Sequence, residues 1–332
     1  MKNLLSFLLI TFSFVTVQGQ TNSSADVLAY SAHEETWENQ LNTITKQGYE
    51  GTLVNLKPLF DENWANFPQT LFWAKIMKMS PDSCFVNIAS NRQIVAKMAL
   101  KDWMKQTVTQ KEAFRDSVRL VYHLDSTAKI NVTTGKSDFY KFDKVYGSLA
   151  KGIKAFAKND VDPWYAQAIL LIESPAQLRK SSTGAYGAFQ LMPGVARSEG
   201  LIVNRHIDER ADFNRSAYAA SNLIKTICLP YARQILATTN LEYKETDWWF
   251  RLFVMHIYHA GASNVRAVVA KIGKVKSGQE LIQKMWQTTA AGFGNNSQNY
   301  SQLALAAQLI IYQMTNGQSA KDFNNSSILS QL

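Results

Sequence analysis

The sequence predicts a mainly α-helical protein in which an all-α C-terminal part follows a mostly helical region with a few short strands. From about residue 143 onward, apolar residues recur at the three- and four-residue spacing of buried helix faces. Before that point, helical patterns mix with two β-like runs, CFVNIAS around Val86 and KINVTTG around Val132. With 332 residues, 46% of them hydrophobic, the chain is long enough to form two domains.

Residues 1–19 have the features of a secretory signal peptide. Lys2 gives a basic start, an apolar run covers residues 4–17, and a compact residue, Gly19, ends the segment. The run is shorter than the ~20 residues that a membrane-spanning helix needs, although a short membrane anchor is the alternative. No Cys follows the run, so lipid attachment is unsupported. We therefore expect export through a cleavable signal peptide, to the periplasm or the cell envelope.

The charge favours polyanionic partners. The formal net charge is +9, and loss of Lys2 with the signal peptide leaves 9 − 1 = +8. For an exported protein the candidate polyanions are cell-wall polymers and membrane surfaces, and we expect no nucleic-acid partner. The basic residues are scattered rather than clustered, so an ordinary solvated surface is the alternative interpretation.

Cysteine usage indicates neither a disulfide framework nor a zinc site. The only cysteines, Cys84 and Cys228, have 143 residues between them. We expect two buried thiols. A bridge between them stays open, because it depends on whether the fold brings their Cα atoms within about 7 Å.

The patterning divides the mature chain into three parts. Residues 20–149 are expected to form an N-terminal domain of unassigned role, with helices and short strands. Its segment WANFPQTLFW is interpreted as helical core, with a wall-facing surface as the alternative. Residues 150–316 are expected to form a compact all-α domain, and residues 317–332 a polar tail.

Each helix of the C-terminal part has its own signal. Asp162 is a suitable N-cap with Pro163 at the first helical position, and the strongly apolar helix that follows must end before Pro175. The other helices are indicated by shared apolar faces: Val145, Leu149, Ile153 and Phe156; Ala220, Leu223, Ile224 and Ile227; Val265, Val268, Val269 and Ile272, behind the expected cap Ser263; and Leu303, Ala304, Ala307, Ile310 and Met314.

Glu173 is the first candidate for chemistry. The run AQAILLI places its carboxyl group at the C-terminal end of a helix that must be largely buried. Apolar neighbours and the negative end of the helix dipole both raise the pKa of such a group. A carboxylic acid that stays protonated near neutral pH can donate a proton to a glycosidic oxygen. A lone Glu at a helix end is by itself usually a surface or capping residue, so its context decides.

That context is the loop GAYGAFQLMPGVA, residues 184–196. Gly184 and Gly187 let the backbone approach a ligand or the base of the Glu173 helix closely. Gln190 carries an amide that can donate to and accept from a sugar hydroxyl or N-acetyl group. Taken alone, such a loop is more often a tight structural turn.

Five segments in order carry a family resemblance: ES, SSTGAYGAFQLMPGVA, DERADFNRSAYAASNLI, YHAGASNV and NYSQLALAAQLI. Together they resemble the motifs of the lysozyme-like catalytic domain of soluble lytic transglycosylases, over about residues 150–316. The resemblance implies a lysozyme-like all-α fold and cleavage of peptidoglycan glycan strands, with no metal or organic cofactor. Residues 20–149 are not covered by it. Three roles are open for them: clamping the glycan, recruiting a cell-wall or envelope protein as partner, and regulating access to the site.

The resemblance also implies roles for individual residues. Glu173 corresponds to the catalytic glutamate, Ser174 to the serine that follows it, and Ser181 to a serine near that carboxyl group. The remaining substrate-binding candidates are Gln190, Tyr258, His259 and Tyr300. The sequence departs from the family pattern at four positions, with Phe189 for the common Met, His259 for the common Asn, and Asn296 and Ser297 where a Glu-Thr pair is frequent.

The expected mechanism follows from a missing carboxylate. Ordinary glycosidases use two carboxylates, and no second one stands out here. Asp208, Glu209 and Asp212 precede a helix, where they suit capping and N-terminal charge placement. The resemblance implies that the acetamido group of N-acetylmuramic acid assists departure. Glu173 then acts first as acid and next as base, leaving a 1,6-anhydro ring.

Three alternatives remain at this level. His256 and His259 lie about one helical turn apart, but a catalytic zinc site usually has a third protein ligand and none is evident. A hydrolytic reaction like that of goose-type lysozymes would use the same lone glutamate. An inactive peptidoglycan-binding module is the third possibility, suggested by the departure at His259.

Overall fold

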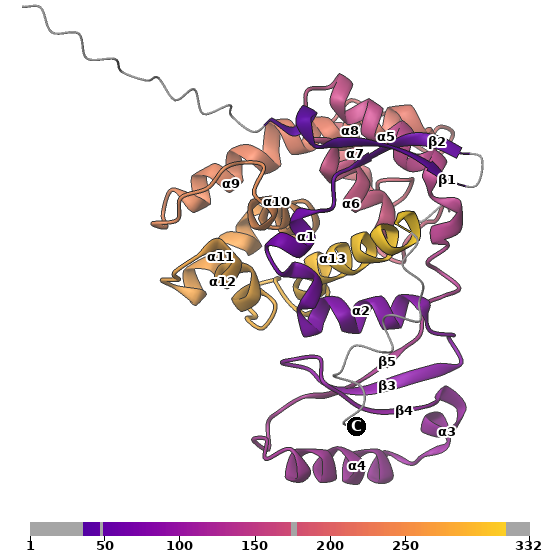
Figure 1. Cartoon of the computed structure of the whole chain (residues 1–332), viewed down its shortest axis with the longest axis vertical. Coiled ribbons are helices and arrows are strands. Elements are labelled where there is room, and N and C mark those ends of the chain that lie inside the picture. The colour runs from indigo at the N-terminus through magenta and orange to yellow at the C-terminus, as the bar shows by residue number, and fades with distance from the viewer. Residues whose placement is uncertain (1–35, 47–48, 174–177, 317–332) are drawn as a thin grey trace, which may run out of the picture. The chain divides into compact units, whose positions relative to one another are not determined.

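The computed structural model describes residues 36–46, 49–173 and 178–316. The expected signal peptide at 1–19 and polar tail at 317–332 lie outside these residues. Before the C-terminal helices, the chain forms β1 (Leu41–Lys46), β2 (Tyr49–Val54), α1 (Pro58–Asp61), α2 (Pro68–Lys78), β3 (Ser83–Ile88), β4 (Ile94–Ala99), α3 (Leu100–Lys105), α4 (Val108–Val121) and β5 (Ile130–Thr134) (Figure 1).

Helices dominate the described residues that follow, as the sequence predicts. They are α5 (Tyr146–Lys158), α6 (Pro163–Glu173), α7 (Pro193–Ser198), α8 (Phe213–Leu223), α9 (Leu229–Leu236), α10 (Trp248–Ala260), α11 (Ala262–Ile272), α12 (Gly278–Met285) and α13 (Asn295–Thr315). The mainly α fold class with a few short strands is therefore confirmed. None of the helices within the described ranges is both long enough and apolar enough to cross a bilayer.

The five strands form two small antiparallel sheets. β1 pairs with β2, from Leu41 opposite Val54 to Lys46 opposite Tyr49. The other sheet has the order β4-β3-β5, with Val86 opposite both Ala96 and Val132. The β-like runs around Val86 and Val132 are thus confirmed as strands. The sequence analysis did not predict β1, β2 and β4.

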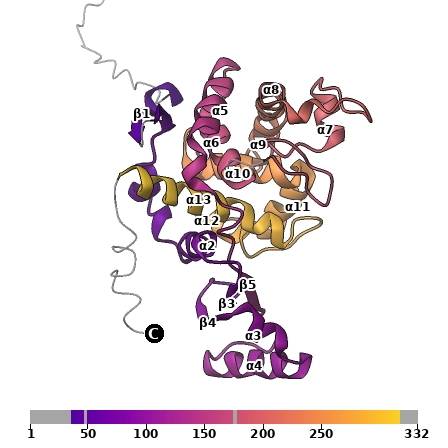
Figure 2. The ribbon, with the colours of Figure 1, turned by 90° about the vertical axis from the view of Figure 1, so that its right-hand side faces the viewer.

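The residues before 150 contribute to two hydrophobic cores. The β4-β3-β5 sheet, α3 and α4 enclose a small core that contains Cys84, Val86, Trp103 and Val118, and these elements lie together next to α2 (Figure 2). The β1–β2 hairpin, α1 and α2 instead join the main core with the C-terminal helices. The segment WANFPQTLFW is mostly helical core, as predicted. The proposed boundary near residue 150 stays a prediction.

Polar contacts in the interior attach this N-terminal part to α6 and α13. The Gln167 side chain on α6 accepts a hydrogen bond from the Val54 N–H on β2 at 3.0 Å and donates to Gln308 on α13 at 3.2 Å. Trp73 on α2 donates to Gln302 on α13 at 3.0 Å. These contacts fix α13 against both the N-terminal part and α6.

Helix α6 is buried along its whole length before its last residue. Asp162 accepts a hydrogen bond from the Trp164 N–H at 2.9 Å, so the predicted N-cap is confirmed, and Pro163 opens the helix. The ten residues from Pro163 to Ile172 are all buried. Full burial of a single Leu or Ile side chain contributes about 1.5–3 kcal/mol. The position of Glu173 is therefore determined by a strongly anchored helix.

Two helix details differ from the sequence prediction. Ile227 was placed on the buried face with Ile224, but it is 41% exposed because a π-helical turn, Ile224–Cys228, inserts a residue and rotates the face. Ser263 is not the cap of α11. That helix begins at Ala262, directly after Gly261, whose φ of 81° reverses the backbone between α10 and α11.

The two cysteines are buried free thiols, as expected. Cys84 belongs to the small core and Cys228 to the main core. Burial raises the pKa of the Cys228 thiol to about 12, so this group stays protonated.

Candidate active site

Glu173 ends α6 as a half-buried side chain. Desolvation by the surrounding protein raises the pKa of its carboxyl group to about 7, and contact with the Tyr300 hydroxyl partly opposes this shift. The carboxyl group is therefore divided between its acid and base forms near neutral pH. This is the environment that the apolar helix sequence predicts, although that sequence gives no indication of the residues facing the helix end.

Three tyrosines from separate parts of the chain surround this carboxyl group. Tyr300 on α13 contacts it, and the Glu173 charge adds to burial in raising the pKa of Tyr258 on α10. Burial and the same charge raise the pKa of Tyr140 as well. Tyr258 and Tyr300 were sequence candidates. Tyr140 was missed, because the segment KSDFYKFDK that contains it carries no motif.

The Tyr300 hydroxyl is buried and forms no well-aligned hydrogen bond with the described residues. Its contact with Glu173 is therefore loose, and a substrate oxygen can compete for it. The Tyr258 hydroxyl, in contrast, already forms a hydrogen bond within the protein, since it donates to the Phe189 carbonyl at 2.7 Å. Tyr258 thus connects the Glu173 surroundings to the loop at 184–196.

This loop approaches the chain closely, as its glycines predict. Gly187 has a φ of 88°, and a Cβ atom there would lie 2.0 Å from the Arg210 carbonyl oxygen. Gln190 also has a positive φ, 47°, and its side-chain amide donates to the carbonyls of Arg179 at 2.8 Å and Gly187 at 3.0 Å. The Gln190 amide thus stabilises the loop through both N–H groups, and its oxygen is left as an acceptor for a ligand.

Arg210 stabilises the same loop from inside. Its side chain is 2% exposed and donates to the carbonyls of Gly184 and Leu191, both at 2.8 Å. Asp208 accepts two further hydrogen bonds from it at 2.8 and 2.7 Å. The sequence analysis did not identify Arg210, because this segment was interpreted only through its acidic residues, as a helix cap.

The capping interpretation is confirmed at two positions. Asp208 accepts a hydrogen bond from the Arg210 N–H, and Asp212 accepts one from the Arg215 N–H at 2.8 Å, at the start of α8. Glu209 accepts from the Ile202 N–H at 2.6 Å and pairs with Arg215. All three carboxylates are thus engaged in local structure. Among the residues that the structure describes, Glu173 is the one carboxylate whose charge acts on all three site tyrosines.

The structure describes one of the two serine candidates, Ser181. Ser181 closes a turn: its hydroxyl accepts from the Ala185 N–H at 2.9 Å and lies 2.9 Å from the Thr183 hydroxyl. No contact between Ser181 and Glu173 is seen in the described ranges. Ser174 lies in the segment 174–177, outside the described residues.

His259 is an exposed residue beside the site. The ring stacks on Tyr300, with centroids 4.2 Å apart and planes 17° apart. The protein around the imidazole ring desolvates it and lowers its pKa. His256, one turn earlier, is fully buried and its Nε2 lies 2.9 Å from the Ser301 hydroxyl. No group of three or more potential metal-binding side chains occurs within residues 36–46, 49–173 and 178–316.

The other departures from the family pattern have different locations. Phe189 is fully buried and packs on the rings of Phe156 and Phe213, with centroids 5.5 and 5.7 Å away. Its side chain therefore belongs to the core rather than to a substrate subsite. In the first turn of α13, Asn296 is exposed and Ser297 is buried.

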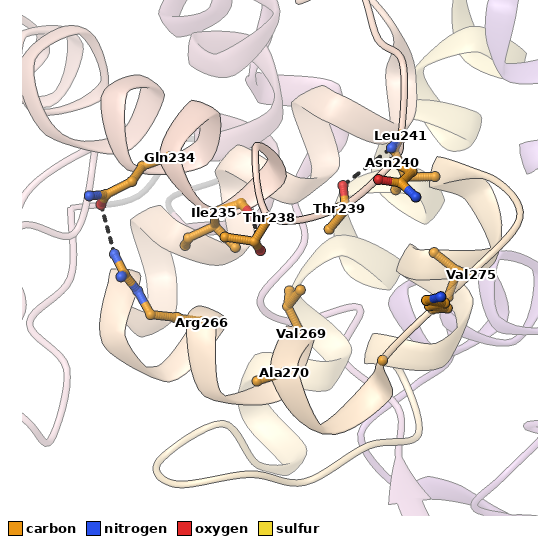
Figure 3. A pocket seen from close by; sticks show the side chains of 12 residues that line it. Gln234, Ile235, Thr238, Thr239, Asn240, Leu241, Arg266, Val269, Ala270 and Val275 are labelled. Atoms are coloured by element: carbon orange, nitrogen blue, oxygen red, sulfur yellow. Dashed lines mark hydrogen bonds between the residues drawn. The ribbon is translucent and has the colours of Figure 1, made fainter.

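A cavity of about 490 Å³ lies elsewhere, where the C-terminal end of α9 faces α11 (Figure 3). Ile235, Thr238, Arg266 and Val269 are among its lining residues, and Arg266 donates to Gln234 at 2.7 Å. None of the site residues named above lines it. This cavity is separate from the candidate active site.

In this all-α part of the chain, a lone, partly protonated glutamate at the end of a buried helix faces tyrosines from two further helices. Residues 152–280 match the family model described as the transglycosylase SLT domain. Residues 152–280 therefore form a transglycosylase SLT domain, the type of domain found in soluble lytic transglycosylases, and such a domain indicates transglycosylase activity on peptidoglycan in general. No curated protein matches the chain.

The matched segment contains most of the site but not all of it. Glu173, Gln190, Tyr258 and His259 lie inside residues 152–280, whereas Tyr300 and Tyr140 lie beyond its two ends. The sequence resemblance was expected to reach residue 316. The helix that supplies Tyr300 is therefore placed at the site by the structure and not by the family match.

Replacement of Tyr300 by Phe is expected to raise the pKa of Glu173 above about 7, because the tyrosine hydroxyl contact lowers it. The measurement is a titration of the Glu173 carboxyl carbon by NMR, with ¹³C-labelled Glu. Tyr312→Phe is the matched control, since Tyr312 lies on the same helix with its ring against Phe60. An unchanged or lower pKa in Tyr300→Phe would contradict the assigned contact.

Proposed function

We propose that this protein cleaves the β-1,4 bond between N-acetylmuramic acid and N-acetylglucosamine, with Glu173 as general acid and then general base. One observation carries this proposal: the Glu173 carboxyl group, inside the transglycosylase SLT match, has a pKa of about 7. A group with that pKa holds a proton in about half of the molecules at neutral pH. It can both give and take a proton at little cost.

In the first step, the protonated Glu173 donates its proton to the glycosidic oxygen while the bond from that oxygen to the muramic C1 breaks. The acetamido oxygen of the muramic acid attacks C1 from the other face. In the second step, the Glu173 carboxylate takes the proton of the sugar's own 6-hydroxyl. The oxygen of that hydroxyl attacks C1 and displaces the acetamido oxygen, which restores the N-acetyl group and closes the 1,6-anhydro ring. Glu173 recovers its proton, and no water, metal or cofactor is consumed.

The other site residues are proposed to bind and orient the glycan. His259 is an exposed residue, and its ring, stacked on Tyr300, is proposed as a flat surface against which the apolar face of a sugar can pack. The Gln190 oxygen can accept from an N-acetyl N–H. Ser174 and Ser181 remain candidates from the family resemblance alone.

Product masses test the reaction type. Digestion of purified peptidoglycan is expected to release anhydro-muropeptides, each lighter by one water than the product of hydrolysis. Release of reducing-end muropeptides would replace this proposal with goose-type-like hydrolysis. Binding to the wall without release of muropeptides, unchanged in Glu173→Gln, would indicate an inactive peptidoglycan-binding module.

We also propose that residues 1–19 direct export and are removed, leaving the enzyme in the periplasm or cell envelope, where the +8 charge favours anionic wall polymers. The N-terminal part is proposed to contact envelope proteins. N-terminal sequencing of the protein recovered from the envelope tests the cleavage, and a mature chain that retains Met1 would rule it out.

A further inference from the structure

A second cavity, of about 410 Å³, lies at the opposite end of α6 from Glu173. Tyr165, in the first turn of the helix, lines it. With a rise of 1.5 Å per residue, Tyr165 lies roughly 12 Å along the helix axis from Glu173, and the buried body of α6 separates the two. The volume falls in the range of about 300–1,000 Å³ that small-molecule sites occupy. No residue of the candidate active site lines this cavity.

The Tyr165 hydroxyl is a buried polar group left without a protein partner. The residue is 1% exposed, and its hydroxyl has no hydrogen bond with any described residue. Burial, followed by the charge of Asp162, raises the pKa of Tyr165, with a smaller contribution from Glu245. Both carboxylates line the cavity together with Tyr165. A buried hydroxyl without a partner costs about 1–3 kcal/mol, which a ligand that hydrogen-bonds to it would recover.

The charged groups of the cavity are already neutralised in pairs. Asp160 pairs with Lys225 at 3.2 Å, and Arg233 pairs with Glu245 at 2.6 Å. Asp162 pairs with the buried Arg251 at 2.7 Å. A charged ligand would have to break one of these pairs or remain unpaired. A neutral ligand can form hydrogen bonds with the carboxylate oxygens and N–H groups that still have bonding capacity within these ion pairs.

Trp37 supplies an aromatic wall to the same cavity and is only partly buried. An aromatic wall beside a rim of hydrogen-bonding groups suits a molecule with one apolar face and several hydroxyls. A pyranose ring has this form, since its axial C–H bonds gather on one face and its hydroxyls point outward. We propose that this cavity is a second carbohydrate site, which binds a neutral sugar unit between Trp37 and Tyr165.

The lining residues of this cavity support a sugar site whether or not Glu173 is catalytic. It would let the enzyme hold one glycan segment at the start of α6 while the site at the end of α6 acts on another. Such a bivalent arrangement raises the effective concentration of substrate without new contacts to the reacting bond.

The test uses the full chain carrying Glu173→Gln, so that no turnover occurs, and a tetramer of β-1,4-linked N-acetylglucosamine as probe. The indole N–H signal of Trp37 in ¹⁵N-tryptophan-labelled protein is identified by its absence in Trp37→Phe. This signal is expected to shift with saturation as the tetramer is added. Tyr165→Phe should weaken the binding reported by this signal about fivefold, and Trp37→Ala should lower the total number of tetramers bound by one.

Stability separates a ligand-binding role of Tyr165 from a structural one. Because the hydroxyl has no protein partner, Tyr165→Phe should leave the Tm unchanged or slightly raised. Tyr218→Phe, at an exposed tyrosine on α8, is the matched control and should alter neither measurement. A Trp37 signal that does not move, or a shift of equal affinity in Tyr165→Phe, would overturn the proposal. Either result leaves the proposed reaction at Glu173 untouched.

Discussion

Replacement of Glu173 by Gln is expected to lower the rate of muropeptide release by about 10⁴-fold. General acid–base catalysis typically contributes 10²–10⁴-fold, and the upper end applies here because one carboxyl group serves both proton transfers. Gln has nearly the same shape but neither gives nor takes a proton near neutral pH. The measurement is the rate of soluble muropeptide release from purified peptidoglycan. Glu242→Gln, at an exposed position, is the matched control and should retain the wild-type rate.

Glu173→Gln should also be more stable than wild type at pH values above the Glu173 pKa, where the wild-type carboxyl group is ionised. The Glu173 pKa is raised by burial from 4.5 to about 7 in the folded protein, so its ionisation destabilises the fold as pH rises from about 4.5 to about 7. The cost reaches about 3 kcal/mol above that window at most, and partial exposure reduces it. Glu173→Gln should therefore unfold at higher urea concentration than wild type at pH 8 but not at pH 4.5. A variant that is inactive and also less stable at pH 8 would point to a structural role.

Replacement of Arg210 by Met is expected to destabilise the protein by about 3–5 kcal/mol. The change removes the cation that pairs with the Asp208 carboxylate. It also leaves the carbonyls of Gly184 and Leu191 without their hydrogen-bond donor. Because the same loop carries Gln190 and receives the Tyr258 hydrogen bond through Phe189, glycan cleavage should fall with stability. Urea unfolding and the muropeptide-release rate measure the two effects.

Arg215→Met is the control for this prediction. Arg215 belongs to the same segment and pairs with Glu209 at 3.0 Å, but its side chain is 43% exposed. Exposed ion pairs are worth about 1 kcal/mol or less, so the variant should lose little stability. If the two arginine variants lost equal stability, the buried contacts of Arg210 would not be what holds the loop.

Local signals predicted the elements that carry the chemistry. Asp162 and Pro163 marked the start of α6, and its apolar residues predicted burial and a raised pKa at Glu173. The glycines of the loop predicted its tight backbone, which Gly187 confirms. These features depend on neighbours within a few residues, so a single sequence contains them.

What the sequence alone determined, then, was a buried helix that ends in one acidic residue beside a glycine-rich loop. The tertiary structure decided what surrounds that residue: it brought Tyr140 to Glu173, used the Ser181 hydroxyl to close a turn, and buried Phe189 in the core. It also placed the β1–β2 hairpin in the main core. Such choices depend on how helices pack across long sequence separations, and the spacing of apolar residues along one helix does not specify that packing.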